Sequence, residues 1–144
     1  MTWLLDTNVL SELRKGPRAD AGVRRWFDDA VDRDLFTSVL VAGELRRGVE
    51  SIRRRNRAAA DGLAQWLESL VERFGERLLP IDATVANRWG ELNVPDPVPT
   101  VDGLLAATAL VHDLTLVTRN VRDVAKTGVR LLDPFTSRSS AGAD

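Results

Sequence analysis

The sequence predicts an α/β fold: a three-layer α/β/α sandwich around a short, mainly parallel central sheet. Three observations predict it. Short apolar runs alternate with stretches of helical period, polar residues follow these runs, and glycine or proline separates several segments. A chain of 144 residues is long enough for one domain with one core. We expect that domain to cover residues 1–135 and a disordered tail to cover residues 136–144.

Five apolar runs have the length of buried strands. In chain order they cover residues 2–5, 35–39, 78–81, 114–118 and 129–132. Strands that alternate with helices usually pair in parallel. We therefore expect the carboxyl ends of these strands to meet at one edge of the sheet, where α/β proteins place their sites.

Apolar residues recur at helical spacing between the strands. They predict helices over residues 9–14, 19–32, 40–48, 57–74, 85–92 and 101–112. The expected N-caps are Thr7 or Asn8 for the first helix, Ser38 for the third and Asp82 for the fifth. Gly75 is expected to end the fourth helix, and a proline-rich loop follows the fifth.

The composition excludes several classes of site. With 44% hydrophobic and 28% charged residues, the chain resembles an ordinary soluble protein. It has no cysteine, which excludes disulfides and thiolate-bound zinc and favours a cytoplasmic location. Its single histidine, His112, excludes a histidine-rich metal site. No apolar run is long enough to cross a bilayer, so we expect no association with membranes.

Acidic residues stand where apolar segments begin or end. Asp6 follows the first strand, Glu44 and Asp102 lie near the starts of helices, and Asp123 comes shortly after the fourth strand. Carboxylates that converge at one sheet edge repel one another unless a cation neutralises them. Oxygen-only ligands favour hard cations such as Mg²⁺ or Mn²⁺. Such an ion can activate water for phosphodiester hydrolysis.

Other catalytic patterns are missing. The sequence has no phosphate-binding P-loop, no GxGxxG, and no cysteine to pair with histidine. A phospho-acceptor receiver domain would need two adjacent acids after the first strand and a lysine after a late strand. This chain has Asp6 alone and Arg119 at those places, which argues against a receiver.

Four segments together resemble PIN-domain proteins, and more narrowly VapC-type toxins of bacterial toxin–antitoxin pairs. They are Asp6-Thr7-Asn8, residues 41–48 around Glu44, residues 102–109 from Asp102, and residues 116–120. They occur in order and span nearly the whole chain. The resemblance implies an endoribonuclease that needs Mg²⁺, with Mn²⁺ as a substitute, and that cleaves RNA with a metal-activated water. It also implies a homodimer, or a higher toxin–antitoxin assembly, inhibited by a cognate antitoxin protein.

Carried over by position, the resemblance makes Asp6, Glu44 and Asp102 the metal ligands. The fourth acidic position falls either on Asn120, which is an amide, or on Asp123 one helical turn later. We favour Asp123 as the acid. A chain with one acid fewer would favour one metal ion over two.

Further polar residues near these acids could orient carboxylates and waters or contact the RNA. They are Thr7, Asn8, Thr118, Arg119, Asn120 and Arg46. Helix capping is the simpler role for Asn8. Arginine clusters, including Arg46-Arg47 and residues 53–57, fit RNA or an acidic partner, but also an ordinary solvated helix face. A second reading of the whole chain is a non-catalytic PIN-like module that binds RNA or protein.

Overall fold

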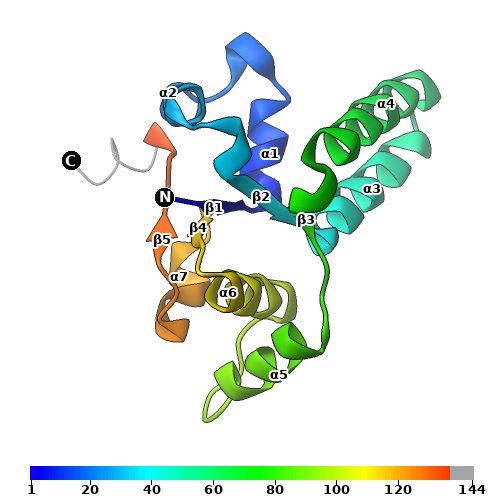
Figure 1. Cartoon of the computed structure of the whole chain (residues 1–144). Coiled ribbons are helices and arrows are strands. Elements are labelled where there is room, and N and C mark those ends of the chain that lie inside the picture. Colours follow the sequence, from blue (N-terminus) through cyan, green and yellow to red (C-terminus); the bar gives the residue numbers. More distant parts are fainter. Residues whose placement is uncertain (137–144) are drawn as a thin grey trace.

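The computed structural model describes residues 1–136. These residues form a parallel sheet with the strand order β3-β2-β1-β4-β5, flanked by helices (Figure 1). The strands are β1 (Trp3–Leu5), β2 (Leu35–Ser38), β3 (Leu78–Leu79), β4 (Thr115–Val117) and β5 (Leu131–Leu132). The expected parallel α/β architecture is confirmed.

Seven α-helices connect the strands within the described residues. They are α1 (Thr7–Leu13), α2 (Ala21–Asp29), α3 (Val39–Arg53), α4 (Arg57–Phe74), α5 (Ala83–Leu92), α6 (Thr100–His112) and α7 (Val121–Val124). Short 3₁₀ turns lie at Gly16–Arg18, Asp32–Asp34, Gly75–Arg77 and Ala125–Thr127. No helix in residues 1–136 is long and apolar enough to cross a membrane.

The core lies around the two central strands. Leu4 and Leu5 of β1 and Val117 of β4 are fully buried. Helices α1 and α2 lie on one side of the sheet, and α5, α6 and α7 lie on the other (Figure 1). Small side chains of α6, such as Ala106 and Ala109, are fully buried in this core. Because alanine is short, α6 can pack close to the sheet.

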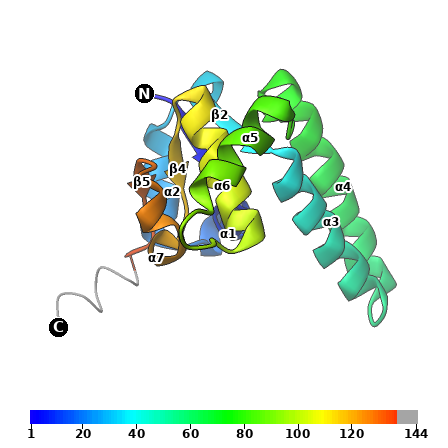
Figure 2. The same ribbon diagram turned by 90° about the horizontal axis from the view of Figure 1, so that it is seen from below.

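Helices α3 and α4 form a hairpin that projects from the body of the protein (Figure 2). A small separate cluster holds its two helices together, with Val49, Ala60 and Leu67 buried between them. Helix α3 begins directly after β2, so the hairpin starts at the end of a strand. From there it leads away from the sheet (Figure 2).

Several sequence expectations need correction at their ends. Neither Thr7 nor Asn8 caps the first helix; Asp6 does, and the helix already begins at Thr7. The second helix covers only residues 21–29, because Asp20 caps its start and the backbone becomes extended at Ala30. Strands β3 and β5 are two residues long, shorter than expected, and α7 was not expected at all.

Other expectations hold. Ser38 caps α3 by accepting a hydrogen bond from the Leu40 amide, and Asp82 caps α5 through the Val85 amide. Helix α4 has the expected bounds and ends at Gly75, whose φ is +52°. The expected start of a disordered tail at residue 136 is wrong, because Thr136 is hydrogen-bonded to Asp20. Residues 137–144 lie outside the described residues.

Candidate functional site

The site forms where β1 and β4 end side by side. The two strands pair in register, with Leu5 opposite Val117. The next residues, Asp6 and Thr118, therefore leave the sheet as neighbours. The Asp6 amide donates to the Val117 carbonyl over 3.0 Å, and the Thr118 hydroxyl donates to Asp6 Oδ2 over 2.7 Å. Two residues that are 112 positions apart in sequence thus share one hydrogen bond at the sheet edge.

Asp6 is a buried carboxylate with few hydrogen-bond donors. The residue is only 5% exposed. Its carboxylate caps α1 by accepting a hydrogen bond from the Thr7 amide over 2.6 Å. Burial raises the pKa of Asp6 above its ordinary value of 3.8, and the nearby Glu44 charge raises it further. The hydrogen bonds from Thr118 and Thr7 oppose this rise without cancelling it. The site therefore disfavours the charge on Asp6 when nothing positive is bound.

Asn8 joins the chain segments that follow the two central strands. Its side-chain amide donates to the Thr118 hydroxyl over 3.3 Å and reaches Asp6 Oδ2 at 3.5 Å. Its carbonyl oxygen accepts from the backbone amide of Arg119 over 3.2 Å. The Asn120 amide also donates to the Thr118 hydroxyl, over 3.0 Å. Asn8 therefore fixes the site's loops to each other and does not cap the helix.

Glu44 comes to the same place from α3. Because Ser38 starts this helix directly at the end of β2, Glu44 lies in its second turn. The Thr7 hydroxyl donates to Glu44 Oε1 over 2.5 Å, which ties α1 to α3. Arg47 Nη2 lies 3.9 Å from Glu44 Oε2, whereas Arg46 pairs with Glu50 over 3.2 Å. Of the two adjacent arginines, the structure brings Arg47 toward the acids.

Asp102 is the acid whose pKa is raised by the charges of all three others, in addition to burial. It lies in the first turn of α6 and is partly buried. Burial, followed by the negative charges of Asp6, Asp123 and Glu44, raises the pKa of Asp102 to about 6. One acid directly follows β1, and the other three lie in α3, α6 and α7. The charges of Asp6, Glu44 and Asp123 all reach Asp102, so the four acids lie in one region.

The described residues hold the acids near one another without assembling a full ligand cage. Within residues 1–136, no group of three or more acidic or histidine side chains is arranged to enclose a metal ion. Mg²⁺ keeps several waters when it is bound, so carboxylates can hold it directly or through a water without forming a closed cage. Asp6 and Asp102, whose charges are disfavoured in the metal-free protein, are the donors that a cation would relieve most.

Asp123 and Asn120 differ in their surroundings. Asp123 lies in α7, is exposed, and is one of the charges that raise the pKa of Asp102. Asn120 is exposed at the start of α7 and makes no capping hydrogen bond with its side chain. Of these two residues, Asp123 is the one whose charge acts on Asp102.

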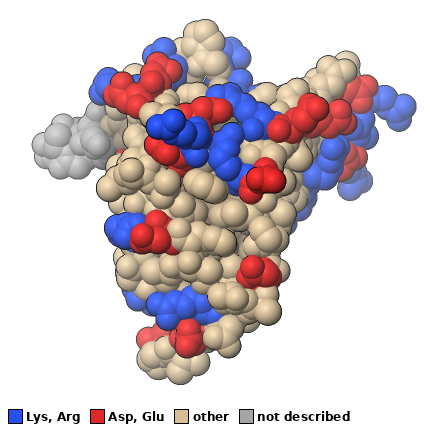
Figure 3. All heavy atoms as spheres, viewed as in Figure 1, with Lys and Arg blue, Asp and Glu red and all other residues tan. Residues whose placement is uncertain are grey.

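The four acids lie apart from the pocket between α1, α2 and α4. A cavity of about 410 Å³ lies between α1, α2 and α4, and none of the four acids lines it. Salt bridges crowd this region: Arg73 and Arg77 both bind Asp32, at 2.6 and 3.6 Å. Figure 3 shows basic and acidic side chains mixed across this face, with no expanse of a single sign.

Two contacts of the site were outside the reach of sequence reasoning. The Thr37 hydroxyl, buried in β2, donates to the Leu5 carbonyl over 2.8 Å and fixes the end of β1. The bond between Thr7 and Glu44 spans 37 positions. A threonine in a strand and a threonine in a helix give no sign of such partners. Trp3 and Trp26 pack against the core and meet edge to face with ring centroids 5.5 Å apart.

The fold and site define a class: a parallel α/β protein with acidic residues gathered at the carboxyl edge of its sheet. The PIN domain family model matches residues 3–128. This chain belongs to the PIN domain family.

Curated relatives of similar length make the comparison more specific. The chain is 32% identical to the toxin FitB of Neisseria gonorrhoeae over 138 residues, which cover 92% of this chain and 97% of FitB. It is also 32% identical to the plasmid stability protein StbB of Pseudomonas syringae, with the same coverage. It is 28% identical to the VapC ribonuclease Y4jK of Sinorhizobium fredii, covering 92% of this chain and 96% of that protein.

Solved structures agree with the fold. The crystal structure of FitAcB from Neisseria gonorrhoeae matches with a TM-score of 0.85 at 32% identity, covering 92% of this chain and 98% of that one. The structure of FitAB bound to the IR36 DNA fragment matches with a TM-score of 0.82 at 29% identity, covering 92% and 95%.

Proposed function

We propose that this protein is an Mg²⁺-dependent endoribonuclease, with Mn²⁺ as a substitute, that acts as the toxin of a toxin–antitoxin pair. The observation that carries the proposal is the meeting of four acids at one edge of the sheet, where Thr118 holds Asp6, Thr7 holds Glu44, and burial with the charges of the other three acids raises the pKa of Asp102. Acids held at such electrostatic cost suit a site for a divalent cation. The name of the relative Y4jK, a VapC ribonuclease, supports RNA as the substrate.

Residues of this chain would bind the cation, and others would hold those ligands in position. Asp6 and Asp102 would hold the cation, with Glu44 as the third ligand and Asp123 as an outer acid that attracts it. Bound there, the cation supplies a polarised water nucleophile and offsets charge on the scissile phosphate. Thr118 and Asn8 hold Asp6 in place, and Thr7 holds Glu44. Such supporting partners commonly change metal affinity or activity by about 10- to 100-fold when they are lost.

Arginine side chains around the acids would bind the RNA backbone. Arg47 lies beside Glu44. Arg119 follows Thr118, just after the end of β4, and its amide donates to Asn8. A guanidinium matches phosphate oxygens in geometry and charge. Arg46, engaged by Glu50, is a weaker candidate for this role.

The partner proposal comes from the relatives. FitB is called a toxin, and the solved structures that match this chain are titled FitAcB and FitAB bound to a DNA fragment. We therefore propose a cognate antitoxin protein that binds this chain and blocks cleavage. We also propose a homodimer, alone or within a larger toxin–antitoxin assembly, acting in the cytoplasm.

Cleavage of RNA by the purified protein tests the enzymatic proposal. A folded single-stranded RNA substrate is incubated with wild type and with Asp6→Asn, each with Mg²⁺, with Mn²⁺ and with EDTA. Asparagine keeps the carbonyl oxygen that caps α1, so the variant should keep its fold while losing a charged ligand. We expect cleavage by wild type with either metal and none with EDTA or by the variant.

Equal RNA loss with wild type and Asp6→Asn would mean contamination and would overturn the nuclease proposal. RNA binding by both proteins, without metal-dependent cleavage by either, would favour the non-catalytic PIN-like module. Cleavage that persists in full with EDTA would overturn the metal requirement alone.

Growth and co-expression test the toxin proposal. Induced wild type should arrest bacterial growth, and Asp6→Asn should not. Co-expression of the short gene found directly upstream should restore growth and give a stable complex that elutes as one species. Arrest that no neighbouring gene relieves would contradict the antitoxin part of the proposal.

A further inference from the structure

We propose that residues Asp133–Thr136 form a clasp that positions Arg119 beside the acidic site, so that its guanidinium meets the RNA backbone with little loss of freedom. The inference rests on the proposed RNA cleavage and adds a positioning role for residues far from the acids. It follows from a chain of contacts that leads from α2, through the clasp, to Arg119.

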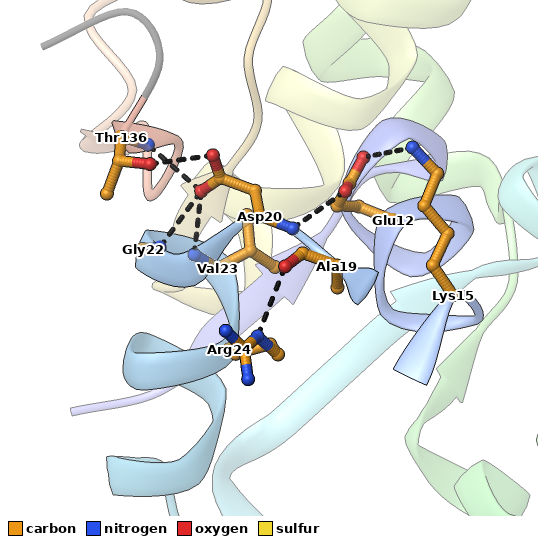
Figure 4. Close-up of polar contacts among 8 residues, drawn as sticks. All are labelled: Glu12, Lys15, Ala19, Asp20, Gly22, Val23, Arg24 and Thr136. Atoms are coloured by element: carbon orange, nitrogen blue, oxygen red, sulfur yellow. Dashed lines mark hydrogen bonds and ion pairs between the residues drawn. The ribbon is translucent and has the colours of Figure 1, made fainter. Parts of the chain in front are cut away.

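The clasp is anchored by Asp20. Its carboxylate accepts from the amides of Gly22 and Val23 over 3.0 and 3.1 Å, which caps α2. The same carboxylate accepts from the amide of Thr136 over 3.0 Å and from its hydroxyl over 2.7 Å. Figure 4 shows these four bonds converging on Asp20 from two segments that are more than a hundred positions apart.

Asp20 is itself held from the other side. Its backbone amide donates to Glu12 Oε2 over 2.8 Å, and Lys15 Nζ lies 3.0 Å from Glu12 Oε1 (Figure 4). Burial alone would raise the pKa of Asp20, but the hydrogen bonds from Thr136, Val23 and Gly22 outweigh burial and lower it to about 2. The anchor therefore stays charged, and keeps all its hydrogen bonds, throughout the physiological pH range.

The clasp lies so close to α2 that only glycine fits beneath it. A Cβ atom added to Gly22 would lie 2.4 Å from the carbonyl oxygen of Pro134 and 2.5 Å from the Thr136 methyl group. Real Cβ atoms do not approach other atoms so closely. The backbone of residues 134–136 is thus fitted to α2 and does not merely pass over it.

Phe135 connects the clasp to the site. The residue is only 3% exposed, and the Asp133 carboxylate accepts a hydrogen bond from its amide over 3.0 Å. The guanidinium carbon of Arg119 lies 4.0 Å from the centroid of the Phe135 ring. This is well within the range of a cation–π contact. A ring packed in the core gives the arginine a platform.

Arg119 is two contacts away from Asp6. Its backbone amide donates to Asn8 Oδ1, and the other end of the Asn8 amide reaches Asp6 Oδ2. The residue is exposed, and stacking on Phe135 uses the face of the guanidinium, whereas a phosphate would bind the N–H groups around its edge. Ordering a free, rotamer-rich side chain costs about 0.5–1.5 kcal/mol on binding. An arginine already stacked on Phe135 avoids much of that cost.

Kinetics of single and double variants test the coupling. With a defined RNA and saturating Mg²⁺, we expect Phe135→Leu to raise KM about fivefold and to leave kcat within about twofold. Arg119→Gln should raise KM at least as much. The double variant should be no worse than Arg119→Gln alone, because Phe135 acts through Arg119. Phe135→Tyr, which keeps an aromatic platform, should restore most of the wild-type KM.

A matched control separates positioning from plain stability. Phe74 is also a buried phenylalanine beneath an arginine, with Arg77 5.4 Å from its ring centroid, but it packs on the α4 side of the core. Phe74→Leu should lower the melting temperature about as much as Phe135→Leu while leaving KM unchanged. Arg130→Gln, which removes a charge from the residue just before β5, should also leave KM unchanged.

Binding in the inactive Asp6→Asn background gives a second readout that needs no cleavage. If Arg119 contacts a phosphate, Arg119→Gln should lower the slope of log affinity against log salt by about 0.7, and Phe135→Leu should lower it partly. KM effects that add fully in the double variant, or a KM that Phe135→Leu leaves unchanged, would overturn the positioning role. If wild type binds RNA with the expected slope but never cleaves it, the proposed function fails and this inference is judged by binding alone. If Phe135→Leu does not fold, Thr136→Val, which keeps Phe135 but removes one bond to Asp20, takes its place with the same criteria.

Discussion

Asp6 and Asp20 occupy equivalent local positions and have opposite properties. Each precedes a helix and caps it, Asp6 for α1 and Asp20 for α2. The pKa of Asp6 is raised by burial and by the Glu44 charge, whereas the pKa of Asp20 is lowered to about 2 because hydrogen bonds outweigh its burial. The two carboxylates differ in what surrounds them, not in their place along the chain.

The difference separates a structural carboxylate from a functional one. Asp20 is supplied with four donors, two of them from Thr136, so its charge stabilises the fold. Asp6 is more deeply buried, shares its region with three other acids, and gains too few hydrogen bonds to compensate. Its charge costs stability in the metal-free protein, as is common where a site is built to bind a cation.

The largest expected effect is the loss of RNA cleavage when the functional carboxylate, Asp6, is replaced. Asp6→Asn should reduce RNA cleavage by at least ~100-fold, the loss typical of one preorganised electrostatic group. Its stability should stay equal to that of wild type or rise, because a buried charge is removed. Cleavage rates and urea denaturation measure the two quantities. A variant that lost both activity and folded structure would mark Asp6 as structural, like Asp20.

The next effect breaks the structural side. Asp20→Ala should destabilise the protein by about 2 kcal/mol, the upper end of the range for an N-cap, because it also releases Thr136. Asp82→Ala is the matched control: Asp82 caps α5 through one bond to Val85, and its loss should cost about 1 kcal/mol. Urea midpoints at neutral pH give both values. Equal costs for the two variants would mean that the bonds to Thr136 add nothing.

The pH dependence of stability sharpens the comparison further. The folded pKa of Asp102, about 6, lies above its ordinary value of 3.8, so the unfolded chain releases this proton first. Stability of the metal-free protein should therefore fall as pH rises from about 4 to 6, and the full penalty remains above 6. Asp20 behaves in the opposite sense: its stabilisation is present above pH 3.8 and is lost as pH falls through about 2.

Melting temperatures in EDTA at about pH 4.5 and about pH 7.5 measure this effect. Wild type should melt a few degrees lower at the higher pH, and Asp102→Asn should show a clearly smaller difference. Asp20→Ala should retain the wild-type difference, because Asp20 does not titrate between these two values. An unchanged pH dependence in Asp102→Asn would show that its carboxyl does not carry the penalty.

The smallest effect concerns the outer end of the Asp20 network. Lys15 pairs with Glu12 over 3.0 Å, but its side chain is 48% exposed. Lys15→Ala should therefore cost less than about 0.5 kcal/mol, as expected for a surface ion pair. Thermal denaturation beside Asp20→Ala checks this. A cost close to that of Asp20→Ala would mean that the anchor depends on Lys15 and not on its own hydrogen bonds.

Local patterns were sufficient for most elements and for the composition of the site. The apolar runs predicted the five strands at their places along the chain. Helical spacing predicted the ends of α4 and α6 to within one residue. Capping failed at the first helix because Thr7 and Asn8 are also good caps by type. Only the register of β1 with β4, which sets Asp6 beside Thr118, makes Asp6 the cap and Asn8 a bridge.

The sequence by itself determined that four acids stand at the ends of strands and helices in a parallel α/β fold, because strand and helix signals are local and carboxyl ends share an edge. Tertiary structure alone decided which partners these acids receive. It pairs Thr7 with Glu44, raises the pKa of Asp102 through burial and the charges of three acids that are far away in sequence, and fastens Thr136 to Asp20. A carboxylate's charge is stabilised or penalised by donors and burial that come from far along the chain. The same residue type can therefore anchor the fold at one helix start and form the site at another.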